Sequence, residues 1–184
     1  MNIEDLVLFT YDAYGGEIRG RTMLQKILYF VSVFLDQDLG YEAHYYGPYS
    51  KTIAEKNNDL TVFGYLKETI TPWGFSTSGF EAARHDYSLT DEAKDIIGRK
   101  KKKFQHEWDK IEQVVNKIKS SGEDLDYIIL SVAAKAYYIL KKENRKTSIE
   151  RIKEIASSFN WAITDDQFER AFCFLEKIEL IAAS

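Results

Sequence analysis

The stretch RTMLQKILYFV at positions 21–31, followed by HYYGPYS at positions 44–50, decides the fold of this chain. Apolar residues in the first stretch recur every three or four positions, which is the spacing of an amphipathic helix. Thr22 and Gln25 have the spacing of a capping box at its start. Gly47 and Pro48 then turn the chain, and proline suits the first turn of the helix that follows, where its missing N–H costs nothing.

The helix of the first stretch is predicted to begin at Thr22, with one face in the core and the other in solvent. The expected core stripe consists of Leu24, Ile27, Leu28, Val31 and Phe34 or Leu35. The residues expected mainly on the opposite face are Gln25, Lys26 and Ser32.

The neighbouring segments complete a unit of three helices and a hairpin. Periodicity predicts helices over 3–14 and about 50–63, each closed by a glycine. Residues 17–19 are long enough only for a short strand. Composition predicts strands at 65–71 and 84–90, with a Pro/Gly-rich tip between them. Helix, helix, helix and hairpin, in that order, are the layout of a winged helix with the hairpin as its wing.

A long helix is predicted over 91–119, with Asp91 and Glu92 at its start. Its apolar residues from Phe104 to Ile118 have heptad-like spacing, which is typical of a seam between helices. Two arrangements would bury that seam: a helical hairpin within the chain, or a homodimer.

The remaining chain is predicted to be a helix-turn-helix-like unit without a visible wing. Its first helix covers 125–140, and capping boxes start the other two. These boxes are Thr147 to Glu150 and Thr164 to Gln167.

The predicted fold class is therefore mainly α (α+β). A winged-helix-like domain with a β-hairpin wing (1–90) leads through a long connecting helix (91–119) to a C-terminal helical domain (120–184). With 45% hydrophobic and 29% charged residues, the composition is that of a soluble globular protein. No signal peptide and no apolar run of about 18 residues is present, so we expect a cytoplasmic protein without membrane contact. The single cysteine, Cys173, lies between phenylalanines and is expected to be buried.

Catalysis is not indicated by any pattern in the sequence. His44, His85 and His106 are scattered, and no pair has metal-ligand spacing on one helix. Gly-rich phosphate loops and nucleophile elbows are absent. We therefore expect no enzyme, no cofactor and no metal site.

Two sets of residues are candidates for macromolecular contacts. For DNA, the third helix would present its polar face and the wing an arginine, while a basic run on the long helix could engage phosphates. The candidate DNA contacts are Lys51, Thr52, Lys56, Asn57, Arg84, Arg99, Lys100, Lys101, Lys102 and Lys103. For protein, exposed aromatic rings are strong interface anchors. The candidate protein contacts are Tyr45, Tyr49 and Trp73, which could equally pack the joint between link, helix and wing.

Leu24, Gln25 and Lys26, joined to Tyr46, Gly47 and Pro48 downstream, resemble the motifs of YwgA-like proteins, which are related in pattern to the Panacea (SocA-like) antitoxin domain. The resemblance covers about half of the chain. It implies a non-catalytic protein that neutralises a toxin or acts as an adaptor by binding another protein, with the six motif residues in a structural role. We therefore favour a protein partner, either a toxin or a host protein. The alternative is a winged-helix transcriptional regulator, which the net charge of −4 disfavours because phosphate contacts dominate DNA affinity.

Overall fold

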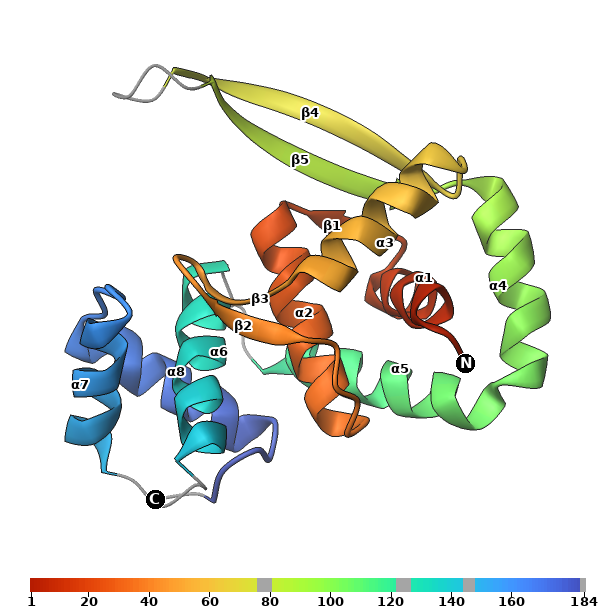
Figure 1. Ribbon diagram of the computed structural model, residues 1–184. Coiled ribbons are helices and arrows are strands. Elements are labelled where there is room, and N and C mark those ends of the chain that lie inside the picture. The colour runs from red at the N-terminus through yellow and green to blue at the C-terminus, as the bar shows by residue number, and fades with distance from the viewer. Residues whose placement is uncertain (76–80, 122–126, 144–147, 183–184) are drawn as a thin grey trace.

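The chain is mainly helical, with two small antiparallel sheets (Figure 1). The structure is a computed structural model that describes residues 1–75, 81–121, 127–143 and 148–182, with the side chains of 73–75, 81 and 82 outside that description. Within these ranges it has eight helices and five strands. None of the described helices is long and apolar enough to cross a membrane.

Helix α1 (Ile3–Tyr14) and strand β1 (Glu17–Arg19) have the predicted bounds. Asn2 and Asp5 form a capping box at the start of α1, and Gly15 ends it with φ +114°, a conformation that glycine adopts without strain. Helix α2 (Arg21–Phe34) begins one residue earlier than predicted. The predicted box of Thr22 and Gln25 is wrong, because Gly20 is the N-cap without a side-chain hydrogen bond and Gln25 bonds elsewhere.

Strands β2 (Tyr41–His44) and β3 (Gly47–Ser50) form a hairpin that the sequence predicted only as a link. Pro48 does not start a helix; it pairs with Ala43 in this hairpin. Ser50 is the N-cap of α3 (Lys51–Val62), where its hydroxyl accepts a hydrogen bond from the Ile53 amide. The proline therefore lies before the helix, where its lack of an N–H removes no helical bond.

The second sheet has the order β1-β5-β4. Strands β4 (Leu66–Phe75) and β5 (Glu81–Leu89) confirm the predicted hairpin, although β4 runs further than expected, through Pro72. Proline is tolerated there because β4 is an edge strand with a register shift at that point. Figure 1 shows this hairpin extending away from the helices.

The predicted long helix over 91–119 is wrong. The chain breaks at Phe104 (φ −121°, ψ +40°) into α4 (Asp91–Lys103) and α5 (Gln105–Ser120). Trp108, Ile111 and Ile118 on α5 are buried within the same chain, with Trp108 edge-on to Phe9 of α1 at 5.6 Å between ring centroids. α5 uses this stripe to cover α1, so the stripe is buried within one chain, and a homodimer through Phe104 to Ile118 stays a prediction.

The C-terminal part consists of α6 (Tyr127–Lys142), α7 (Ile149–Ser158) and α8 (Asp165–Lys177). The capping box of Thr164 and Gln167 is confirmed. Residues Leu125 and Thr147 lie outside the described chain, and the hydroxyl that caps α7 belongs to Ser148. Cys173 is exposed rather than buried, because the buried stripe of α8 consists of Phe168, Ala171, Phe174 and Leu175.

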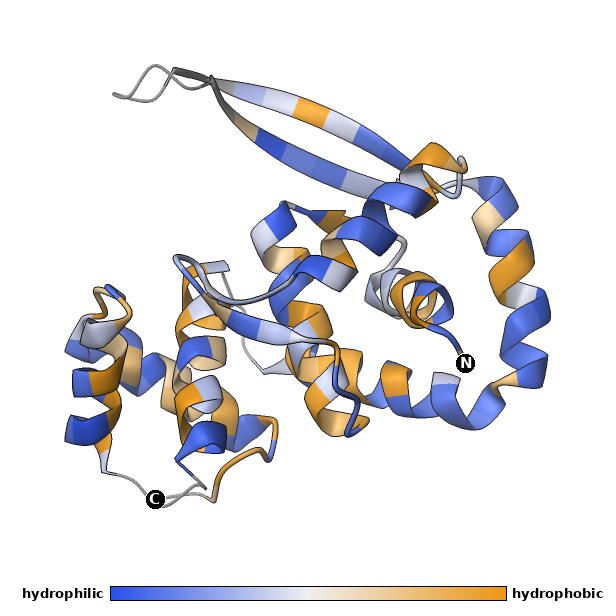
Figure 2. Cartoon of the chain, in the orientation of Figure 1, coloured by the Kyte–Doolittle hydropathy of each residue, from blue (hydrophilic) through white to orange (hydrophobic). Residues whose placement is uncertain are grey.

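Helix α2 lies at the centre of one continuous core (Figure 2). Phe30 contacts Phe174 of α8 at 5.4 Å between ring centroids, while α1 and α5 cover another side. Because α6 and the β2–β3 hairpin cover the remaining face, Gln25, Lys26 and Ser32 are buried. The expectation that these three side chains face solvent is therefore wrong.

Candidate functional site

Gln25 fixes the base of the β2–β3 hairpin to helix α2. Its amide nitrogen donates to the Ser50 carbonyl at 3.0 Å, and its amide oxygen accepts from the Ser50 N–H at 3.0 Å. The Ser50 hydroxyl donates to the Leu39 carbonyl at 2.5 Å. The buried glutamine therefore satisfies both backbone groups of Ser50, which would otherwise be unpaired in the core.

Lys26 holds the middle of β3. Its side chain is only 1% exposed, and its ammonium donates to the Pro48 carbonyl at 2.6 Å. Burial, with a smaller effect of the Lys135 charge, lowers the pKa of Lys26 from 10.5 to about 7. Burial also lowers the pKa of Lys135 on α6. We call Lys26 and Lys135 the lysine pair.

Gly47 packs directly on the lysine pair. A Cβ atom at this position would lie 2.9 Å from Cγ of Lys135 and 3.4 Å from Cε of Lys26, and the backbone has φ +98°. Both the close approach and the left-handed conformation require glycine. The Gly-Pro step therefore belongs to the packing of the hairpin against α2 and α6.

A third anchor holds the end of the hairpin. The indole N–H of Trp161, in the connection between α7 and α8, donates to the His44 carbonyl at 2.7 Å. Trp161 itself is buried and lies 5.4 Å from the Lys135 ammonium, measured from the ring centroid. The hairpin is thus fixed by α2, by α6 and by the α7–α8 connection.

The turn of this anchored hairpin exposes two adjacent tyrosines. Tyr45 is 66% and Tyr46 58% exposed, and their rings meet edge to face at 4.9 Å between centroids. We call these two residues the tyrosine tip. His44 and Tyr49 stack beside it at 5.1 Å, with Tyr49 half-buried. Among the six motif residues, Tyr46 alone is exposed. The side chain of Trp73 lies outside the described part of the chain.

The candidate DNA contacts on α3 do not form an open cationic face. Lys51 pairs with Glu55 at 3.5 Å, and Lys56 pairs with Glu4 of α1 at 2.8 Å. Asn57 is not outward: it is 4% exposed and accepts a hydrogen bond from the buried Tyr11 hydroxyl at 2.8 Å. Thr52 is half-buried.

The side chains of the basic run at positions 99–103 point in different directions, because consecutive residues lie around the circumference of helix α4. Lys100 and Lys101 turn toward α1, where they pair with Asp5 and Asp12, respectively. Arg99, Lys102 and Lys103 remain exposed. On β5, the Arg84 guanidinium donates to the Asp86 carboxylate at 2.9 Å. The structure therefore does not bring the ten DNA candidates together as one surface.

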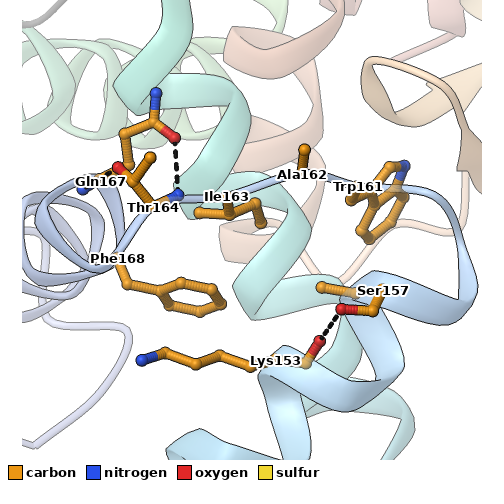
Figure 3. Close-up of a pocket in the computed structure, with 9 residues that line it drawn as sticks. Lys153, Ser157, Trp161, Ala162, Ile163, Thr164, Gln167 and Phe168 are labelled. Atoms are coloured by element: carbon orange, nitrogen blue, oxygen red, sulfur yellow. Dashed lines mark hydrogen bonds between the residues drawn. The ribbon is translucent and has the colours of Figure 1, made fainter.

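An open hollow of about 420 Å³ lies between α7 and α8 (Figure 3). Trp161, Ile163 and Phe168 give it apolar walls, and Lys153 pairs with Asp165 at 2.5 Å near its edge. Figure 3 shows Lys153 and Phe168 lying side by side. The Ser157 hydroxyl donates to the Lys153 carbonyl at 2.9 Å, and the Gln167 amide oxygen accepts from the Thr164 N–H at 3.1 Å, so polar groups of the lining bond to one another.

Two residues of the hairpin site were missed from the sequence. Lys135 carried a usable signal, because it is the only charged residue in the apolar stretch YIILSVAAKAYYIL at 127–140. Trp161 carried no comparable signal, since its contact with His44 links positions far apart in the sequence.

Comparison with known proteins adds no assignment. No model of a protein family matches the chain, and no curated protein matches it.

Proposed function

We propose that this chain is a non-enzymatic protein that acts by binding a protein partner, in an antitoxin-like or adaptor role. The observation that carries the proposal is the tyrosine tip, two adjacent exposed tyrosines on a hairpin anchored at three points. The partner would be a toxin or a host protein, as the resemblance to YwgA-like and Panacea-type proteins implies.

Physical reasoning supports the tyrosine tip as a contact surface. Tyrosine buries a large area with few rotatable bonds, and it is enriched among residues that dominate binding energy. A hairpin already fixed by Gln25, Lys26 and Trp161 loses little conformational entropy when it binds. Exposed aromatic rings held in this way would be costly in water without a compensating use.

We also propose that residues 1–90 form a winged-helix-like unit. The element order α1, β1, α2, α3, β4, β5 and the sheet order β1-β5-β4 support this view. The β2–β3 hairpin would then be an insertion between the second and third helices of that unit. The motif residues of the proposed family fix this insertion to α2.

DNA binding is the second candidate function. The placement of α3 and of the β4–β5 hairpin favours it, because these are the elements that read DNA in winged helices. Internal pairing of Lys51, Lys56, Lys100 and Lys101 with carboxylates weighs against it. So does the net charge of −4. Protein binding is therefore the first choice.

The test places a photo-crosslinking amino acid at Tyr45 or Tyr46 in cells of the source organism, with Glu169, exposed on α8, as the control position. We expect one dominant protein adduct from the tyrosine tip and none from the control. Identical adduct patterns from all three positions would contradict the proposal.

DNA binding is measured separately, by fluorescence anisotropy of a labelled duplex across a salt series. Steep salt dependence that Lys51→Ala flattens would favour the DNA candidate instead.

A further inference from the structure

The lysine pair is an unusual cationic site in an acidic protein. Other half-buried lysines of the chain pair with carboxylates, as Lys56 does with Glu4 and Lys101 with Asp12. Neither Lys26 nor Lys135 has a carboxylate within salt-bridge distance among the described residues. Within the part of the chain that the structure describes, the Lys26 ammonium has the Pro48 carbonyl as its acceptor.

The lysine pair lies directly under the tyrosine tip. Gly47, which follows Tyr46 in the chain, would touch both lysine stems if it carried a Cβ atom. Lys26 is fully covered, whereas Lys135 is partly exposed. Below pH 7, where Lys26 is protonated, an anion that reaches Lys135 from solvent would therefore also be attracted by a second, buried cation behind it.

The electrostatics of this arrangement favour a bound anion. Below pH 7, where Lys26 is protonated, the two like charges raise each other's energy, and the surrounding burial strengthens every charge interaction at this point. An anion between solvent and Lys135 would relieve that repulsion and add charge-assisted hydrogen bonds.

We propose that Lys135, backed by Lys26, binds an aspartate or glutamate side chain of the protein that contacts the tyrosine tip. This inference rests on the proposed function and adds the chemistry of the partner: an acidic segment beside apolar residues. A side chain is the carboxylate source, because capture of a chain terminus uses a nest of backbone N–H groups, and a projecting hairpin turn provides no such enclosure.

The test uses fluorescein-labelled hexaglutamate with an amidated C-terminus, and measures its binding to the full chain by fluorescence anisotropy. We expect Lys135→Met to weaken binding on the order of tenfold or more, as for loss of a hydrogen bond to a charged group. Lys135→Arg should retain most of the affinity. Lys102→Met, an exposed lysine on α4, is the matched control and should change it less than about twofold.

Three results would overturn the inference: no hexaglutamate binding at low salt, equal weakening by Lys135→Met and Lys102→Met, or equally tight binding of hexaglutamine with a free C-terminus. The last result would assign the site to chain termini. Circular dichroism of each variant verifies that it is folded.

Failure of the inference and failure of the proposed function give different results. If Tyr45 crosslinks a partner but hexaglutamate does not bind, only the acidic chemistry is wrong. If hexaglutamate binds through Lys135 while the tyrosine tip crosslinks no protein, the protein-binding function is wrong and the anion site stands.

Discussion

Replacement of Lys26 by methionine should change how stability depends on pH. Methionine has a similar length and no proton to lose. In the native fold Lys26 is 1% exposed, and its pKa falls from 10.5 to about 7 through burial and the nearby Lys135 charge. At 1.36 kcal/mol for each pH unit, keeping this ammonium charged in the fold costs about 5 kcal/mol.

The pH range of the effect follows from the two pKa values. Below pH 7 Lys26 is protonated in both the folded and the unfolded chain, so its contribution does not vary. Between pH 7 and 10.5 the unfolded chain holds a proton that the folded chain has released, and stability rises with pH. For the wild-type chain this rise amounts to about 2 kcal/mol between pH 7 and pH 9.

The assay is urea unfolding at pH 6, 7, 8 and 9, with Lys102→Met as the exposed control. We expect the alkaline rise in wild type and control, and a rise smaller by about 2 kcal/mol in Lys26→Met, where only groups such as Lys135, whose pKa burial also lowers, still contribute. Loss of the hydrogen bond to the Pro48 carbonyl takes about 1 kcal/mol from the free energy of unfolding of Lys26→Met at every pH. This loss is a constant offset and does not change how the stability of the variant varies with pH. Parallel curves for Lys26→Met and wild type from pH 7 to 9 would refute the reasoning.

Three further substitutions test the anchoring of the hairpin and the core, each by urea unfolding at one pH. Gly47→Ala should lose about 3 kcal/mol of stability, because the backbone is strained and the new Cβ atom clashes with the lysine pair. The control Gly64→Ala, with φ +79° and open space around it, has the strain alone and should lose about 1 kcal/mol. Equal losses in the two variants would contradict the clash. Gln25→Leu should lose about 3 kcal/mol because Ser50 N–H and C=O are left unpaired, and a loss below about 0.5 kcal/mol would show that water replaces the amide. Asn57→Ala should lose about 2 kcal/mol of stability because the buried Tyr11 hydroxyl loses its acceptor. Unchanged stability would show that the Asn57 side chain is exposed to solvent and does not accept this buried hydrogen bond.

Local patterns predicted the elements whose causes are local. The bounds of α1, the strand β1 and the capping box of α8 follow from residues within a turn or two of one another. The β4–β5 hairpin was found because β-rich runs flank a Pro/Gly-rich tip. In each case neighbouring side chains satisfy the backbone, so the sequence alone carries the information.

The missed features depend on distant partners. A helical wheel assumes one buried face, but α2 is covered on all sides over residues 24–32, so the polar side chains Gln25, Lys26 and Ser32 are buried as well. The β2–β3 hairpin is held by side chains of α2 and α6 and by Trp161, which lie far away in sequence. The break at Phe104 lets α4 and α5 pack on successive parts of α1, where Lys100 and Trp108 find their partners.

The polar motif residues and the tyrosine tip have separable physical roles. Gln25 and Lys26 are buried because they satisfy backbone groups of the hairpin. The hydrogen bond from the Lys26 ammonium to the Pro48 carbonyl offsets part of the free-energy cost of burying this lysine. Their loss should therefore remove activity through stability. Tyr45 and Tyr46 contribute little to the core, so their loss should remove partner binding from a fold that stays intact. Under the proposed function, a motif that spans both groups couples a rigid support to the surface that binds the partner.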